Sequence, residues 1–313
     1  MNQFRDCNLE NLMVAGGGVL GSQIIFQSAY AGLNVTVWLR SEESIQRTKE
    51  KLEKLKNAYQ QFAFACQNGT QNYLGALDIP VTAVAEGDYE LYQSRIETAM
   101  EHIYFETDLE KAAAGQDFII ESITENMEMK KEFYQKLNLY VSDETVIATN
   151  TSTFLPSDFK DIIRKPERFI AVHFANHIWL ANIAEIMGHA GTAETTQKRA
   201  VKFAESINMI PSVIHKETKG YILNALLIPF MTAALKLWGS GIADYRAIDN
   251  TWKLSTASPY GAFEIMDIVG LKTMYAMCST CMDSSLIQQE GTLENQIAEK
   301  LKAMIASDSK FYS

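Results

Sequence analysis

The chain has 313 residues, a formal net charge of −10 at pH 7, and 47% hydrophobic and 21% charged residues. This length favours about two domains, each large enough to bury its own core. The acidic balance speaks against general nucleic-acid binding, for which a basic domain is expected. Residues 1–8 carry no signal-peptide pattern, and no run approaches the ~20 apolar residues of a membrane span. We therefore expect a soluble, cytoplasmic protein that binds neither membrane nor nucleic acid.

The chain opens with a predicted strand, a glycine-rich turn and a helix. The apolar run Leu12–Ala15 leads into Gly16, Gly18 and Gly21, spaced as G-x-G-x-x-G, and an amphipathic helix is predicted from Val19 to Ala31. These glycines permit a tight turn, close approach of the backbone to a pyrophosphate, and close packing of helix on strand. Because the motif stands between a strand and a helix, it predicts a dinucleotide-binding site.

The second strand, Val35–Leu39, bears on which dinucleotide binds. An acidic residue for the ribose 2′-hydroxyl of NAD is expected about 20 residues after the first glycine. Leu39 occupies that place, and Arg40 and Ser41 follow it. An arginine here can receive the 2′-phosphate of NADP, or it can be a solvated charge at the end of the strand. The residues alone leave NAD and NADP open.

The next stretch reads as helical. Residues 41–65 predict a long charged helix with Leu52, Leu55 and Tyr59 as its apolar stripe, and another helix is expected before Thr107. We interpret residues 41–107 as a helical insertion. Further strands are predicted at Phe118–Ile120, Val146–Ala148, Phe169–His173, Ile183–Met187 and Ser212–Ile214. Apolar strands that alternate with helices are typical of a doubly wound, mostly parallel sheet, so residues 1–216 predict a Rossmann-type α/β domain.

After Lys219 the strand signal ends, and residues 217–313 predict an all-helical domain. Its helices are expected at Tyr221–Trp238, Tyr245–Leu254, Ala262–Met282 and Thr292–Ile305. Cys278 and Cys281 form a lone C-x-x-C without a second pair of zinc ligands nearby. We interpret them as two small buried side chains and expect no metal site.

A dehydrogenase needs a group that takes the proton of the substrate hydroxyl, and histidine is the usual choice. His173 ends an apolar strand, and active sites of open α/β sheets lie beyond such carboxyl ends. His189 and His215 also follow apolar runs, so position alone does not decide among them. Glu185 lies within an apolar strand, where a charge is costly unless it is paired. We expect Glu185 to pair with His173, because a carboxylate orients a general-base histidine.

A polar cluster, Asn150–Thr153, follows the strand that ends near Thr149. It should emerge at the same sheet edge as the glycine turn. Its hydroxyl groups could hold a substrate carbonyl or the nicotinamide ribose. Alternatively, Thr153 or Ser157 caps a helix that begins near Pro156.

Taken together, these residues resemble the L-3-hydroxyacyl-CoA dehydrogenase family over essentially the whole chain. Within that family, the motifs are most similar to those of the diketoreductase branch. The matching motifs are GGGVLG at 16–21, ESITENMEMK at 121–130, ATNTST at 148–153, HFAN at 173–176, AEIMG at 184–188, KGYILNALLIPF at 219–230 and GAFEIMDIVGL at 261–271. In this order and spacing they are specific. The resemblance implies that His173 is the general base or acid and Glu185 its partner. Ser152 and Asn224 would hydrogen-bond the substrate oxygen, and Asn176 would shape the site.

The resemblance also implies a cofactor side of the site. Glu125 and Lys130 would lie there, and we add Asn150 from the polar cluster. The inserted helices would contact CoA, with Arg47, Lys49, Lys51, Lys54 and Lys56 available for its phosphates. Glu50 and Glu53 are interleaved at helical spacing, so a solvated ion-pair face is the alternative. The helical domain would form a homodimer.

We therefore expect NAD(P)-dependent, reversible oxidation of a short 3-hydroxyacyl-CoA, such as 3-hydroxybutyryl-CoA, to the 3-ketoacyl-CoA, an activity of fatty acid metabolism. NAD is the expected cofactor, with NADP possible because Leu39 replaces the acidic residue. One alternative is a diketoreductase-like or sugar-acid dehydrogenase that acts on free β-keto or β-hydroxy acids or esters. An alternative of another class is a catalytically silent dinucleotide-binding protein.

Overall fold

The computed structural model describes residues 9–67, 89–279 and 282–312. It divides into two compact units, Met1–Tyr221 and Ile222–Ser313, whereas the sequence placed the boundary at residues 216/217. The helices of the first unit, in chain order, are α1 (Val19–Tyr30), α2 (Glu42–Gln67), α4 (Tyr89–Thr98), η2 (Ala99–His102), α5 (Leu109–Ala113), α6 (Met127–Leu137), η3 (Pro156–Asp158), η4 (Pro166–Arg168) and α7 (Glu194–Ser206).

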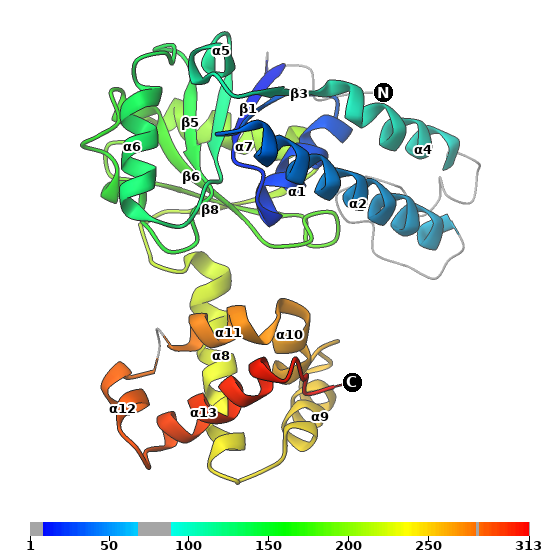
Figure 1. The fold of residues 1–313 in the computed structure, drawn as a ribbon, viewed down its shortest axis with the longest axis vertical. Helices are drawn as coiled ribbons and strands as arrows, with labels where there is room; N and C mark the ends of the chain where they lie inside the picture. The colour runs from blue at the N-terminus through cyan, green and yellow to red at the C-terminus, as the bar shows by residue number, and fades with distance from the viewer. Residues whose placement is uncertain (1–8, 68–88, 280–281, 313) are drawn as a thin grey trace. The chain divides into compact units, whose positions relative to one another are not determined.

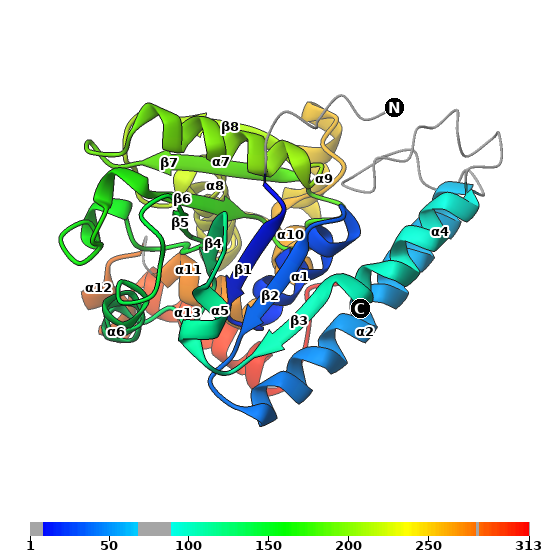
Figure 2. The ribbon, with the colours of Figure 1, turned by 90° about the horizontal axis from the view of Figure 1, so that it is seen from above.

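The first unit is built on one sheet. Among the described residues its strands are β1 (Asn11–Ala15), β2 (Asn34–Trp38), β3 (Ile103–Glu106), β4 (Phe118–Glu121), β5 (Val146–Thr149), β6 (Phe169–Phe174), β7 (Ile183–Gly188) and β8 (Ile210–Ile214). Their spatial order is β3-β2-β1-β4-β5-β6-β7-β8, and every neighbouring pair is parallel except β6 and β7. Figures 1 and 2 show the strands between layers of helices. The predicted doubly wound, mostly parallel sheet is confirmed.

Both faces of the sheet are buried, which explains why its strands read as continuous apolar runs. In β1, Leu12 and Val14 point into a core formed with α1, α2 and α7. Met13 and Ala15 point into the opposite core, which contains residues of α5 and α6. Each large side chain buried in this way contributes roughly 1.5–3 kcal/mol. The alternation of side chains along one strand therefore serves two separate cores.

The insertion after β2 is only partly as predicted. Helix α2 buries the expected stripe of Leu52, Leu55 and Tyr59, and it lies beside α4 (Figures 1 and 2). The two predicted helices are present, but the helical insertion predicted over residues 41–107 extends too far, because residues 103–106 form the edge strand β3, which pairs with β2. This strand has only four residues, and it is specified by its partner β2 more than by its own pattern. Residues 68–88 lie outside the described part.

The second unit is helical, as predicted. Its helices are α8 (Tyr221–Gly239), α9 (Tyr245–Thr256), α10 (Ala262–Val269), α11 (Leu271–Ser279), α12 (Ser284–Gln288) and α13 (Leu293–Ala306). The single helix expected over residues 262–282 is wrong, because Gly270 adopts a left-handed φ of 95° and separates α10 from α11. A glycine takes this conformation without the steric cost of a side chain. Cys278 is buried as expected, and Cys281 lies outside the described residues.

Helix α8 corrects one reading of the sequence. Over its 19 residues it is long and apolar enough, by length and composition, to cross a membrane, and 28% of this apolar stretch is buried. Met231, Ala234 and Leu235 nevertheless pack into the core of the second unit. Ile222, Leu226 and Leu237 are exposed.

The predicted homodimer through this domain stays a prediction, which light scattering on the whole 35.1 kDa chain would test.

Candidate active site

The glycine turn has the geometry that a bound pyrophosphate requires. Gly16 has a φ of 112°, and a Cβ there would lie 2.4 Å from the carbonyl oxygen of Ser122. A Cβ on Gly21 would lie 2.4 Å from the carbonyl oxygen of Gly16. At Gly18, the N-cap of α1, a Cβ would meet no atom of the described residues within 4 Å. The turn therefore packs tightly against β4 while Gly18 faces open space, and these residues fit a dinucleotide on the amide groups of α1.

Leu39 and Arg40 follow the end of β2, and the choice between NAD and NADP depends on them. Leu39 is 6% exposed and belongs to the core, so it offers no side-chain acceptor for a ribose hydroxyl. Arg40 is exposed, and its guanidinium forms no hydrogen bond or ion pair with any residue that the structure describes. Its charge is the only polar side-chain feature at these two positions.

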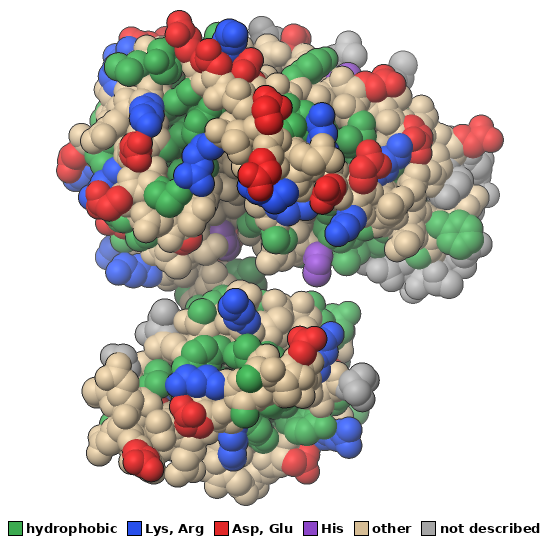
Figure 3. Space-filling model, viewed as in Figure 1, with side chains coloured by type: hydrophobic (Ala, Val, Ile, Leu, Met, Phe, Trp, Pro, Cys, Tyr) green, Lys and Arg blue, Asp and Glu red, His purple; other side chains and the backbone are tan. Residues whose placement is uncertain are grey.

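The basic residues of α2 are mostly engaged within the protein. Lys51 donates to the carbonyl oxygen of Gly17 (2.8 Å). Arg47 pairs with Glu43 one turn earlier, and Lys56 pairs with Glu97 of α4. Figure 3 shows acidic and basic side chains interspersed over this face instead of one basic patch. Arg47 thus forms an i,i+4 ion pair, but with Glu43 and not with Glu50 or Glu53 as the alternative expected. The proposed contact with CoA phosphates stays a prediction.

His173 and Glu185 form the pair that the sequence predicted. The antiparallel register of β6 and β7 sets them directly opposite each other. The distance from Nδ1 of His173 to a carboxylate oxygen of Glu185 is 2.9 Å, and both side chains are at most 4% exposed. Because an ionised carboxylate only accepts hydrogen bonds, Nδ1 carries the proton and Nε2 is the basic nitrogen. A base aligned in this way needs no reorientation before it takes a proton.

Ser152 lies at the basic nitrogen. Its Oγ is 3.1 Å from Nε2 of His173. It stands in the loop after β5, and the carboxyl ends of β5 and β6 meet at one edge of the sheet. The hydroxyl of Thr153, one of the two candidates for a helix cap, donates to a carboxylate instead, and the hydroxyl of Thr151 donates to the same group. The cluster thus presents one hydroxyl to the imidazole.

That carboxylate belongs to Glu125 and organises the loop. It accepts hydrogen bonds from the backbone amides of Ser152 (3.1 Å) and Thr153 (3.0 Å) and from the hydroxyls of Thr151 and Thr153. Burial by itself would raise the pKa of Glu125, but the charge of Lys130 and these hydroxyls outweigh it and lower the pKa. The carboxylate therefore stays ionised and can hold Ser152 in place.

Lys130 links this loop to a buried charge that the sequence reasoning missed. Its ammonium is 1% exposed and lies 2.5 Å from Glu121 and 3.2 Å from Glu125. Glu121 is fully buried and also accepts hydrogen bonds from Tyr134 and Thr149. The signal was available: Glu121 ends the apolar strand β4, and a buried carboxylate requires a partner. Lys130 is predicted to contact the cofactor, but its ammonium already has two carboxylate partners.

The three asparagines of the prediction lie in different places. Asn150 is buried, donates to Oγ of Ser122 (3.2 Å) and accepts from the amide of Phe174 (3.1 Å), so it joins the ends of β4 and β6. Asn176 is exposed in the loop after β6. Asn224 is half-buried on α8, within the second unit. Their roles toward cofactor and substrate stay predictions.

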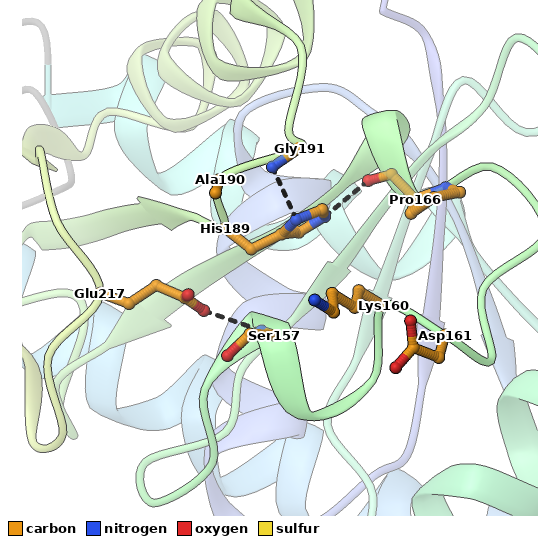
Figure 4. A pocket seen from close by; sticks show the side chains of 8 residues that line it. All are labelled: Ser157, Lys160, Asp161, Pro166, His189, Ala190, Gly191 and Glu217. Carbon is orange, nitrogen blue, oxygen red and sulfur yellow. Dashed lines mark hydrogen bonds between the residues drawn. The ribbon is translucent and has the colours of Figure 1, made fainter.

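The competing histidines are used differently. Nε2 of His189 donates to the carbonyl oxygen of Pro166 (2.8 Å), so its Nδ1 accepts from the amide of Gly191 (3.0 Å). The ring lies at the wall of a cavity of about 310 Å³, and Figure 4 shows both of its nitrogens in hydrogen bonds. His215 is exposed. Of the three histidines that follow apolar runs, His173 is the one paired with a buried carboxylate.

Comparison with known proteins agrees with this geometry. Residues 11–218 match the model of the NAD-binding domain of 3-hydroxyacyl-CoA dehydrogenase, and residues 220–313 match its C-terminal domain. The chain belongs to the 3-hydroxyacyl-CoA dehydrogenase family. As a member of that family, it is an oxidoreductase that acts on CH–OH groups and has an NAD-binding domain.

Several relatives support the assignment along the whole chain. Mitochondrial hydroxyacyl-coenzyme A dehydrogenase of Rattus norvegicus is 27% identical over 297 residues, which are 93% of this chain and 87% of the relative. 3-Hydroxybutyryl-CoA dehydrogenase of Clostridioides difficile is 25% identical over 85% of both chains. A solved structure of a diketoreductase, reported for catalysis of dicarbonyl compounds, is 34% identical, covers 98% of this chain and 99% of its own, and has a TM-score of 0.80.

Proposed function

We propose that this dehydrogenase interconverts the 3-hydroxyl and 3-keto groups of a short-chain acyl-CoA, with His173 as the group that takes and returns the proton. The observation that carries the proposal is the line from Glu185 through His173 to Ser152, with contacts of 2.9 and 3.1 Å. The family relatives named for 3-hydroxyacyl-CoA and 3-hydroxybutyryl-CoA support this class of substrate.

His173, Glu185 and Ser152 each have a separate role in the proton transfer. Nε2 of His173 accepts the proton of the substrate hydroxyl, and Glu185 stabilises the imidazolium that forms through the hydrogen bond at Nδ1. The hydroxyl of Ser152 orients the reacting oxygen beside Nε2. When bound, the nicotinamide ring supplies the hydride acceptor in oxidation and the hydride donor in reduction. In reduction the protonated His173 returns the proton to the new alkoxide oxygen.

Burial strengthens this arrangement. His173 is 4% and Glu185 is 2% exposed, so the charge pair formed in the reaction is poorly screened by water and attracts strongly. Hydrogen bonds among Glu125, Thr151, Ser152 and Thr153 fix the loop of Ser152. The reacting groups are thus preorganised, which lowers the cost of reaching the transition state.

A second candidate is reduction of a free β-diketo ester or acid. The observation that favours it is the 34% identity to the diketoreductase structure, compared with 25–27% to the CoA dehydrogenases quoted above. In both candidates the proton transfer at His173 is the same, and only the recognition of the CoA portion differs.

Initial rates of reduction decide between the two candidates. We expect turnover of acetoacetyl-CoA with a KM well below that for a free diketo ester, and inhibition by CoA itself. Turnover of the diketo ester alone, without inhibition by CoA, would select the second candidate. Cofactor binding without turnover of either substrate would contradict both and restore the catalytically silent alternative.

We also propose that Arg40 allows NADP(H) to bind as an alternative to NAD(H), since its exposed guanidinium forms no hydrogen bond or ion pair with any described residue. Arg40→Ala should raise the KM for NADPH about tenfold and leave that for NADH within about twofold, because one charge-assisted hydrogen bond is worth roughly 1.5–3 kcal/mol. Leu39→Asp should shift the preference toward NADH, since a carboxylate repels the 2′-phosphate. Equal KM values for NADPH in the wild type and Arg40→Ala would refute the role of Arg40.

A further inference from the structure

Tyr221 is a buried tyrosine against the face of His173. The two rings stack with centroids 4.4 Å apart and planes inclined by 15°. The tyrosine is 1% exposed, within a small apolar cluster with Ala171, Met187 and Ile214. Its ring therefore closes one side of the imidazole, while Glu185 and Ser152 occupy the two nitrogens.

The hydroxyl of Tyr221 has no hydrogen-bond partner among the described residues. A buried polar group without a partner costs stability, and phenylalanine would fill the same space without that cost. Burial raises the pKa of Tyr221, and the charges of Glu125 and Glu185 raise it further. The hydroxyl therefore keeps its proton at working pH and is available as a donor.

The backbone supplies a third, independent observation. Tyr221 has a φ of 54° and follows Gly220 with a φ of 80°. A bulky residue in the left-handed region is strained, and such strain gathers at functional sites. Here it turns the chain at the last residue of the first unit so that the ring lies flat on the imidazole.

We propose that Tyr221 is a further residue of this active site: its ring holds the imidazole of His173 from one face, and its unpaired hydroxyl donates a hydrogen bond to an oxygen of the bound substrate. The proposal rests on the proposed function of His173 as the proton acceptor. The stacked ring also favours the imidazolium, because a cation is attracted to the face of an aromatic ring.

Two substitutions distinguish the contribution of the Tyr221 hydroxyl to catalysis from that of its ring. Tyr221→Phe keeps the stacked ring and removes the hydroxyl. It should raise the thermal midpoint and lower kcat/KM about tenfold, the loss expected for one hydrogen bond of typical strength. Tyr221→Leu removes both features and should lower kcat/KM further. Ser28→Ala is the matched control, since Ser28 is also a buried hydroxyl without a partner, within α1. It should leave kcat/KM unchanged.

The ring has a readout that needs no substrate. The carbon-bound protons of the His173 imidazole can be followed by NMR on histidine-labelled whole protein, with their signals assigned by their loss in His173→Gln. Tyr221→Leu should shift these signals, because the stacked aromatic ring that shields them is removed. Tyr221→Phe keeps the ring and should leave them nearly unchanged.

The outcomes are distinct. A Tyr221→Phe variant with unchanged kcat/KM would show that the hydroxyl only packs. Unchanged imidazole signals in Tyr221→Leu would overturn the role of the ring. If the wild type turns over none of the 3-hydroxy or 3-keto compounds, the proposed function and the role of the hydroxyl fall together. The NMR comparison of the two variants still decides the role of the ring in that case.

Discussion

Replacing His173 with alanine should lower kcat by about 10²–10⁴-fold in both reaction directions, because general acid–base catalysis is usually worth that much. The imidazole holds the only basic nitrogen beside Ser152 that the described residues provide, at 3.1 Å from its Oγ. The dinucleotide should bind with unchanged affinity, since the glycine turn is built from β1, α1 and the end of β4. Steady-state kinetics and a fluorescence titration with NADH measure the two quantities.

The control for this variant is His215→Ala, which removes an exposed histidine and should keep wild-type kcat. Glu185→Gln should lose less than His173→Ala, because the imidazole remains while the stabilisation of its charged form weakens. A His173→Ala protein that retains more than about a tenth of wild-type kcat would show that another group takes the proton.

Replacing Lys130 with methionine should lower the free energy of unfolding by about 3–5 kcal/mol, because removal of one partner leaves an uncompensated buried charge. Glu121 is fully buried, and Lys130 is its only cationic partner among the described residues. Urea unfolding of the whole chain measures the loss. Lys136→Met on the same helix, which breaks only the exposed pair with Glu132, should leave the free energy of unfolding nearly unchanged, because exposed ion pairs contribute little to stability.

The same variant should respond differently to acid. The pKa of Glu125 is lowered in the folded protein, so its contribution to stability is full above its unfolded pKa of about 4.3 and is lost as pH falls through the lower folded value. Without Lys130 the pKa of Glu125 should rise, so that ionised Glu125 contributes much less to the stability of the variant. The difference in stability between wild type and Lys130→Met should therefore narrow below about pH 4. A difference that stays constant with pH would contradict the assigned role of Lys130.

The substitution of Lys130 should also lower the catalytic rate. Glu125 holds the backbone of Ser152, and Lys130 holds Glu125. We therefore expect Lys130→Met to lower kcat more than Lys136→Met does, even at temperatures where both variants are folded. This links the buried ion pair to the position of one hydroxyl beside His173.

Much of the site could be predicted because its signals are local. The glycine spacing after β1 and the charged residue within the strand that contains Glu185 are visible in short windows of sequence. Glu121 carried the same kind of signal as Glu185, but its partner lies nine residues away on a helix, where no strand register points to it. Tyr221 had no signal, since an aromatic residue at the start of an apolar helix indicates core packing.

The sequence by itself determined the alternation of strands and helices, the dinucleotide turn and the pairing of His173 with Glu185, because hydrophobic periodicity and the cost of buried charge act on neighbouring residues. Only the tertiary structure decided that residues 103–106 form an edge strand, that Gly270 divides a helix, and that Tyr221 lies on the imidazole. These features depend on contacts between residues far apart in the chain or on a backbone angle that a hydrophobic pattern does not encode. The structure also shows why Ser152 faces Nε2 of His173: buried charges on β4 and α6 hold its loop in place.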